Sequence, residues 1–278
     1  MGFKCGIVGL PNVGKSTLFN ALTASHQAES ANYPFCTIEP NQGIVQVPDT
    51  RLEVLSKIAS SKKIIPSVFE FVDIAGLVKG ASQGQGLGNQ FLAHIREVDA
   101  IVQVIRCFED ENVIHVEGSV APARDLDIIT IELALSDADS IEKRLQRLKK
   151  GKSPDSDQAP LLEKILPFVK EGQRPPIETF TKEEKAQLPL LQLLCTKPML
   201  IAANVSEETL ANPESNAHFK AIQDYAKTLN MSVVPVSIQI ESELVSLPEE
   251  EKAEFLDSLG ITDSGVNSLI RASYALLG

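Results

Sequence analysis

Residues 9–17 read GLPNVGKST and fit the phosphate-binding pattern G-x-x-x-x-G-K-[ST]. An apolar run at residues 5–8 predicts a strand before the motif, and residues 17–24 predict a helix after it. A glycine-rich turn between a strand and a helix directs backbone N–H groups toward phosphate oxygens. The stretch therefore predicts a P-loop, and it assigns six residues to the nucleotide: Asn12, Val13, Gly14, Lys15, Ser16 and Thr17.

Three further positions complete a predicted phosphate and Mg²⁺ site. Lys15 is expected to neutralise the β and γ phosphates, and the Ser16 hydroxyl to ligate Mg²⁺. Asp73 ends a predicted strand (67–74) in the pattern D-x-x-G, where the carboxylate holds Mg²⁺ through water. Thr37 lies in a polar loop (25–42) and is the candidate switch threonine that ligates Mg²⁺ while the triphosphate is intact. The alternative for Thr37 is an ordinary exposed loop residue.

The residue after Gly76 is Leu77, where many nucleotide switches carry a glutamine that orients the attacking water. Because a leucine side chain cannot hydrogen-bond to water, another group must position the attacking water. His115 follows the carboxyl end of a predicted apolar strand (100–106), the side of an α/β sheet that carries the site. It is therefore the candidate for a mobile catalytic group, whereas His94, in a predicted helix beside Phe91 and Ile95, is expected to be packed or at the surface.

Composition describes an ordinary globular protein. The 278 residues are 43% hydrophobic and 23% charged, and the net charge of -11 argues against a surface that coats nucleic acid, so no DNA partner is expected. The four cysteines are far apart and suggest neither a disulfide framework nor a zinc site. No apolar run reaches the length of a membrane span or a signal sequence, which predicts a cytoplasmic protein with no membrane partner.

The strand pattern stops between about residues 123 and 194. Apolar residues there step by three and four, pause at a break (151–159) and resume at 160–170, as in two packed helices. We therefore expect an α/β fold with a mostly parallel central sheet and an inserted antiparallel helical hairpin. Its parts are 1–122, the hairpin at 123–196, and 197–278, where strands at 198–205 and 232–236 precede two final helices. Basic residues near the hairpin tip either contact RNA phosphate or form a solvated helix end: Lys143, Arg144, Arg147, Lys149, Lys150 and Lys152.

The predicted base site departs from guanine specificity. Guanine-specific switches carry N-K-x-D at the end of the strand that corresponds to 198–203. The stem of the lysine stacks on the base, and the aspartate accepts hydrogen bonds from the N–H groups of guanine. Here Asn204 is kept, Val205 replaces the lysine and Glu207 replaces the aspartate. Losing one bidentate pair removes about ten- to hundredfold of base preference, so adenine becomes acceptable. Ser237 ends the last strand on the same side and joins the predicted nucleotide contacts.

Four segments together resemble the YchF (Obg-like ATPase) family: GLPNVGKS at 9–16, PFCTIEPN at 34–41, DIAGLVKGA at 73–81 and NVSE at 204–207. The resemblance implies a P-loop switch that prefers ATP over GTP, hydrolyses slowly with Mg²⁺ and associates with the ribosome or its RNA. It also implies the class in which a hydrophobic residue, here Leu77, replaces the catalytic glutamine. In related members the residue matching Asn12 helps to hold K⁺. Family members usually continue into a C-terminal TGS domain, which is not expected within these 278 residues.

The sequence therefore predicts an ATP-hydrolysing switch with Lys15, Thr37 and His115 as catalytic residues and Ser16, Thr37 and Asp73 at the metal. One alternative is a GTPase that tolerates Glu207. The other is a non-catalytic module whose shape depends on the bound nucleotide. Leu77 favours that module, whereas the intact set of phosphate and metal residues opposes it.

Overall fold

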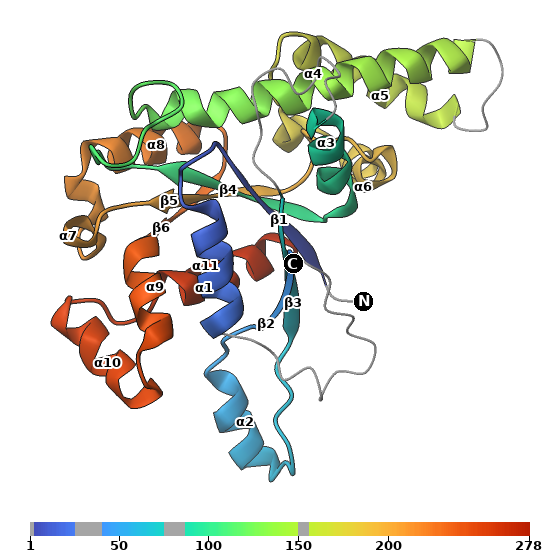
Figure 1. Cartoon of the computed structure of the whole chain (residues 1–278). Helices are drawn as coiled ribbons and strands as arrows, with labels where there is room; N and C mark the ends of the chain where they lie inside the picture. Colours follow the sequence, from blue (N-terminus) through green and yellow to red (C-terminus); the bar gives the residue numbers. More distant parts are fainter. Residues whose placement is uncertain (1–2, 26–40, 75–86, 150–155) are drawn as a thin grey trace.

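The computed structural model describes residues 3–25, 41–74, 87–149 and 156–278. Its six strands form one sheet in the order β2-β3-β1-β4-β5-β6, in which only the β2–β3 pair is antiparallel (Figure 1). The strands are β1 (Lys4–Gly9), β2 (Gln42–Gln46), β3 (Val68–Asp73), β4 (Ala100–Arg106), β5 (Met199–Asn204) and β6 (Ser232–Val236). The mostly parallel α/β fold predicted from the sequence is confirmed.

Helices cover both faces of the sheet. In Figure 1 one layer lies below the sheet and comprises α1 (Lys15–Ser25), α9 (Ile238–Ser246) and α11 (Gly265–Leu276). The layer above comprises α3 (Leu87–Glu97), α4 (Pro122–Lys149) and α8 (Ala217–Thr228). Every residue of β4 and β5 is buried between these layers, as expected for parallel strands that are covered on both faces.

Apart from the helices that pack on α4 in the hairpin, three helices of the described chain lie outside these two layers. The first, α2 (Arg51–Ala59), projects from the β2–β3 end of the sheet and has no buried residue (Figure 1). The second is the short α7 (Glu207–Leu210), and the third is α10 (Glu249–Ser258). The prediction of two helices after β6 was wrong, because Leu247 and Pro248 adopt extended backbone and separate α10 from α9. None of the helices in the described part of the chain combines the length and apolar character needed to cross a bilayer.

The helical hairpin is formed by α4 and α5 (Ala159–Lys170), which run antiparallel along the top of the molecule (Figure 1). Buried residues of the two helices share one core: Ala134, Ala138, Ile141, Leu145, Leu161, Leu162, Ile165 and Val169. A third helix, α6 (Lys182–Leu191), adds Leu188 and Leu191 to this core. The buried Asp137 of α4 accepts the backbone N–H groups of Leu194 and Cys195 at 3.0 and 2.8 Å, which fixes the return of the chain to the sheet. Burial raises the pKa of the Asp137 carboxyl.

A second buried carboxyl joins α9 to α11. Glu241 is 1% exposed, and its Oε1 accepts the N–H of Gly265, the first residue of α11, at 2.7 Å. Burial raises the pKa of Glu241 to about 7, and the nearby Asp263 carboxylate acts in the same direction, although the N–H groups of Gly265 and Val266 oppose the shift. This carboxyl is therefore expected to titrate near neutrality in the folded protein.

Glu241 should make stability depend on pH between about 4.5 and 7. The folded state binds this proton more tightly than the unfolded chain, so its stabilisation is complete below pH 4.5 and is lost as the pH rises through 7. The expected loss is about 2–3 kcal/mol of unfolding free energy. In urea unfolding at pH 4.5 and 7.5, Glu241→Gln should not show this fall in unfolding free energy. Glu243→Gln, at an exposed position of the same helix, should show it as wild type does. Equal pH profiles for wild type and Glu241→Gln would contradict the assignment.

Candidate functional site

The predicted P-loop connects the end of β1 to the start of α1, at the carboxyl edge of the parallel strands. Its backbone enters the left-handed region at Asn12 (φ 62°) and Gly14 (φ 95°). A Cβ at Gly14 would lie 2.7 Å from Ile238 Cδ1 of α9 and 3.1 Å from Asn204 Nδ2. Glycine at position 14 is thus required by both backbone conformation and space. Val13 is 2% exposed, whereas Thr17, in the first turn of α1, is exposed.

Three predicted phosphate and metal residues meet beside this loop. β3 is the neighbour of β1 and places Asp73 opposite Ile7 in the register. Ser16 Oγ donates to Asp73 Oδ2 at 3.0 Å, and the Lys15 ammonium forms an ion pair with Oδ1 of the same carboxylate. The two charged side chains are only 10% and 13% exposed. Phosphate oxygens would compete with Asp73 for Lys15, and the hydroxyl and carboxylate oxygens at this point are the kind of ligand that Mg²⁺ prefers.

Two predicted switch positions lie outside the described residues. Thr37 falls within 26–40, and Leu77 falls, together with Gly76, within 75–86. The structure therefore places the lysine, the serine and the aspartate of the site but does not test the threonine or the leucine.

Asn204 connects three parts of the site. Its Nδ2 donates to the Val13 carbonyl of the P-loop at 3.0 Å, and its Oδ1 accepts the N–H of Ile238, the first residue of α9, at 3.2 Å. Since the side chain comes from the end of β5, it ties this strand to the P-loop and to α9. Asn204 is 6% exposed, and both ends of its amide are used within the protein.

The other residues predicted at the base have different environments. Val205 is 1% exposed within a core cluster that includes Ile105 and Phe219, so its side chain does not provide the surface on which a base stacks. Glu207 is exposed at the start of α7, where a ligand can reach it. Ser237 is 1% exposed, and its hydroxyl has no hydrogen-bond partner among the residues that the structure describes.

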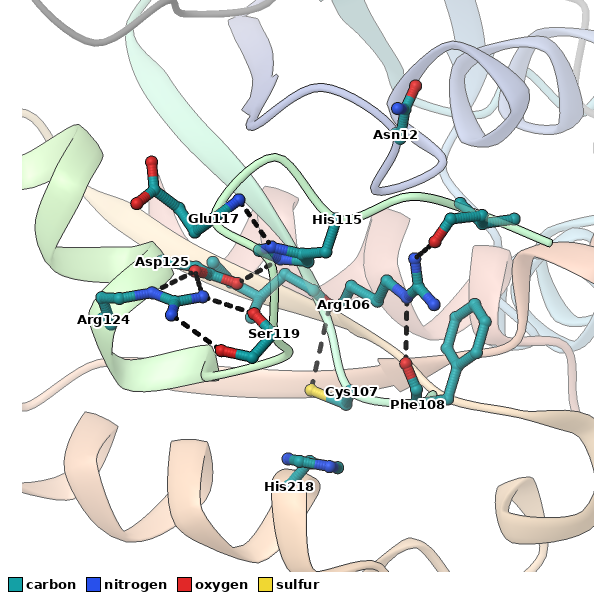
Figure 2. Close-up of polar contacts among 12 residues, drawn as sticks. Asn12, Arg106, Cys107, Phe108, His115, Glu117, Ser119, Arg124, Asp125 and His218 are labelled. Atoms are coloured by element: carbon teal, nitrogen blue, oxygen red, sulfur yellow. Dashed lines mark hydrogen bonds and ion pairs between the residues drawn. The ribbon is translucent and has the colours of Figure 1, made fainter. Parts of the chain in front are cut away.

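His115 lies in the segment that connects β4 to α4, and this segment passes beside the P-loop residue Asn12 (Figure 2). The Asn12 amide donates to the Ile114 carbonyl at 3.2 Å, so the residue before the histidine contacts the P-loop. The His115 side chain is 5% exposed, with Nε2 2.8 Å from Asp125 Oδ2 and Nδ1 accepting the Glu117 N–H at 3.2 Å. In this arrangement the predicted mobile group is held by the protein through both ring nitrogens.

Residues 4–142 match the protein family described as 50S ribosome-binding GTPase. The ribosome-binding ATPase YchF of Bacillus subtilis is 51% identical over 283 residues, which cover 100% of this chain and 77% of the relative. The chain belongs to the YchF family. A YchF from Escherichia coli O157:H7 is 49% identical over 281 residues, with 100% of this chain and 76% of the relative covered. The solved structure of the Schizosaccharomyces pombe YchF GTPase has a TM-score of 0.83 at 38% identity, and the match covers 99% of this chain and 76% of that one.

Two residues of this YchF-family site were not predicted from the sequence. Arg106 ends β4 and is only 1% exposed, and its guanidinium donates to the Phe108 carbonyl (Figure 2). It also donates to the carbonyls of Asp110 and Val113. It thereby shapes the segment that carries His115. Asp125, in the first turn of α4, is the partner of the histidine. The only sequence signal for Arg106 was a charged residue at the end of an otherwise apolar strand.

Proposed function

We propose that this chain is an ATP-hydrolysing switch of the YchF family. The observation that carries the proposal is the convergence of Lys15, Ser16 and Asp73 beside the P-loop, at the N-terminus of α1. Relatives named ribosome-binding ATPase share 49–51% of their residues with it over the whole chain, which supports ATP as the nucleotide and the ribosome as a partner.

The residues of the proposed mechanism either stabilise negative charge at the phosphates or position the attacking water. The Lys15 ammonium exchanges Asp73 for phosphate oxygens and stabilises the charge that develops on the transferred phosphoryl group. Ser16 and Thr37 would hold Mg²⁺, with Asp73 acting through water, and the ion would supply further positive charge at the phosphates. With Leu77 at the glutamine position, His115 is the candidate to position the attacking water. Slow intrinsic turnover follows, since positioning is most of the catalysis in phosphoryl transfer.

Several finer features belong to the same proposal. Asn12 at the P-loop is the candidate K⁺ residue, although its amide nitrogen contacts Ile114 in this structure. The parts 1–122, 123–196 and 197–278 are proposed as the functional divisions of a cytoplasmic protein. The basic residues of the hairpin tip are candidates for ribosomal RNA, with the exception of Arg144, whose guanidinium binds the Leu191 carbonyl and the Gln158 side chain.

The nucleotide preference is tested by calorimetric titration of the full chain with nonhydrolysable ATP and GTP analogues in Mg²⁺. ATP is expected to bind at least about tenfold more tightly, because Val205 and Glu207 do not reproduce the guanine-reading pair. Tighter GTP binding would assign the chain to the GTPases. Phosphate release with Mg²⁺ and K⁺ then separates an enzyme from a binding module, which would show no turnover.

Glu207→Asp should move the preference toward GTP. The shorter carboxylate restores the group that accepts from guanine N–H donors, and position 207 is exposed at the start of α7, so the change costs little stability. GTP affinity should rise about ten- to thirtyfold while ATP affinity changes little. Glu208→Asp, the next exposed residue of the same helix, is the control in the same titration. No change in the GTP to ATP ratio would remove Glu207 from the base site.

A further inference from the structure

The ring of His115 is fully engaged by the first turn of α4 and its own segment. Nδ1 accepts the Glu117 N–H and therefore carries no proton, so the neutral ring has its proton on Nε2 and donates it to Asp125 Oδ2 at 2.8 Å. His115 is 8% exposed and Asp125 is 0% exposed. In this orientation neither ring nitrogen is available to take a proton or orient a water.

Asp125 does not depend on the histidine for its charge balance. Its Oδ1 accepts from Arg124 Nε and Nη2 at 3.2 and 3.0 Å, and Arg124 also binds the carbonyl and hydroxyl of Ser119 (Figure 2). Asp125 lies in the first turn of α4, where the helix dipole stabilises a negative charge. If His115 leaves, the carboxylate still has a cation and a helix N-terminus beside it. The contact can therefore open without leaving an isolated buried charge.

The segment that contains His115 contacts both the P-loop and helix α4 of the hairpin. At one end, the Asn12 amide of the P-loop donates to the Ile114 carbonyl. At the other end, the ring points away from Asn12 and toward Asp125 (Figure 2), which lies in the first turn of α4, the 28-residue first helix of the hairpin. A shift of α4 would therefore act on the histidine directly, while its backbone stays linked to the P-loop.

We propose that Asp125 is a positioning residue that latches His115 to α4, away from the attacking water, and that movement of the hairpin releases the histidine for hydrolysis. This inference rests on the proposed function, in which His115 serves the reaction. It assigns a role to the hairpin: a partner that displaces α4 accelerates hydrolysis without contacting the nucleotide.

The test is steady-state ATP hydrolysis by the full chain carrying Asp125→Asn. The amide oxygen keeps an acceptor of the same shape but accepts more weakly than a carboxylate, so the released form becomes more populated. We expect kcat to rise about three- to tenfold with KM within about twofold. The double variant His115→Ala/Asp125→Asn should return to the slow rate of His115→Ala, because the gain acts through the histidine. Asp127→Asn, which alters a carboxylate two residues further along α4 that accepts from the Tyr225 hydroxyl, should leave kcat unchanged.

The outcomes separate the latch from the proposed function. A wild-type chain without ATP turnover refutes the proposed function. If His115→Ala turns over as fast as wild type, the histidine has no role in hydrolysis and the latch proposal is refuted with it. If wild type turns over and His115→Ala is slow, an unchanged or lower kcat for Asp125→Asn overturns the latch alone, as does a double variant as fast as Asp125→Asn. Nitrogen-15 NMR of the His115 ring in the wild-type chain needs no variant to fold: the latch requires a proton on Nε2, and its absence overturns the proposal.

Discussion

Lys15→Ala is expected to lower kcat for ATP hydrolysis by at least about a thousandfold. Lys15 is the cation that the structure places beside both the P-loop and Asp73, where phosphoryl charge would develop. Its loss removes a preorganised charge whose side chain is only 10% exposed, and the remaining Ser16 and Asp73 cannot replace a positive charge. Phosphate release under single-turnover conditions, with protein in excess over ATP, measures the chemical step directly.

Two controls distinguish this effect from a general loss of structure. Lys4→Ala removes an ion pair to Glu70, also between β1 and β3, from the opposite end of those strands. It should leave hydrolysis within about twofold, since exposed ion pairs contribute little to stability. Lys15→Arg keeps the charge but changes its shape and reach, so it should recover only part of the rate. Wild-type turnover by Lys15→Ala would contradict the P-loop assignment.

The sheet could be predicted from the sequence because its central strands are buried on both faces. β4 and β6 were predicted with the bounds that the structure gives, at 100–106 and 232–236. β4 is buried along its whole length, and its mostly apolar sequence is typical of a parallel strand that is covered on both faces. The helices were harder to predict. α6 begins with a capping box at Thr181 and Glu184, a local signal that the sequence contains, yet its interior Pro189 obscures the helix. α10 begins with an acidic run at residues 249–251, which lacks the apolar spacing that marks the start of a helix.

The phosphate residues of the site could be predicted because each follows from local spacing and from the edge of the sheet. Lys15, Ser16 and Asp73 meet as the parallel β1 and β3 require. The partners that fix the site could not be predicted, because they depend on contacts between distant segments. No sequence pattern shows that Arg106 would bind the carbonyls of the next turn, or that the His115 ring would face α4.

Asn204→Ala is expected to lower both stability and nucleotide affinity, because Asn204 joins three segments through one buried amide. The change leaves the Val13 carbonyl and the Ile238 N–H without their partners in a site that is closed to solvent. Each unsatisfied buried group costs about 1–3 kcal/mol, so the unfolding free energy should fall by about 2–4 kcal/mol. The P-loop also loses its fixation at Val13, and the affinity for a nonhydrolysable ATP analogue should fall at least about tenfold.

Asn204→Asp separates the two contacts of the amide. The carboxylate still accepts from the Ile238 N–H, but its second oxygen faces the Val13 carbonyl with no proton to donate. If fixation of the P-loop controls affinity, this variant should bind the ATP analogue as weakly as Asn204→Ala while the α9 contact survives. Urea unfolding and calorimetric titration of both variants measure the two effects separately. Full affinity in either variant would show that the P-loop holds its left-handed turns without β5, through the Gly14 backbone and its packing on Ile238.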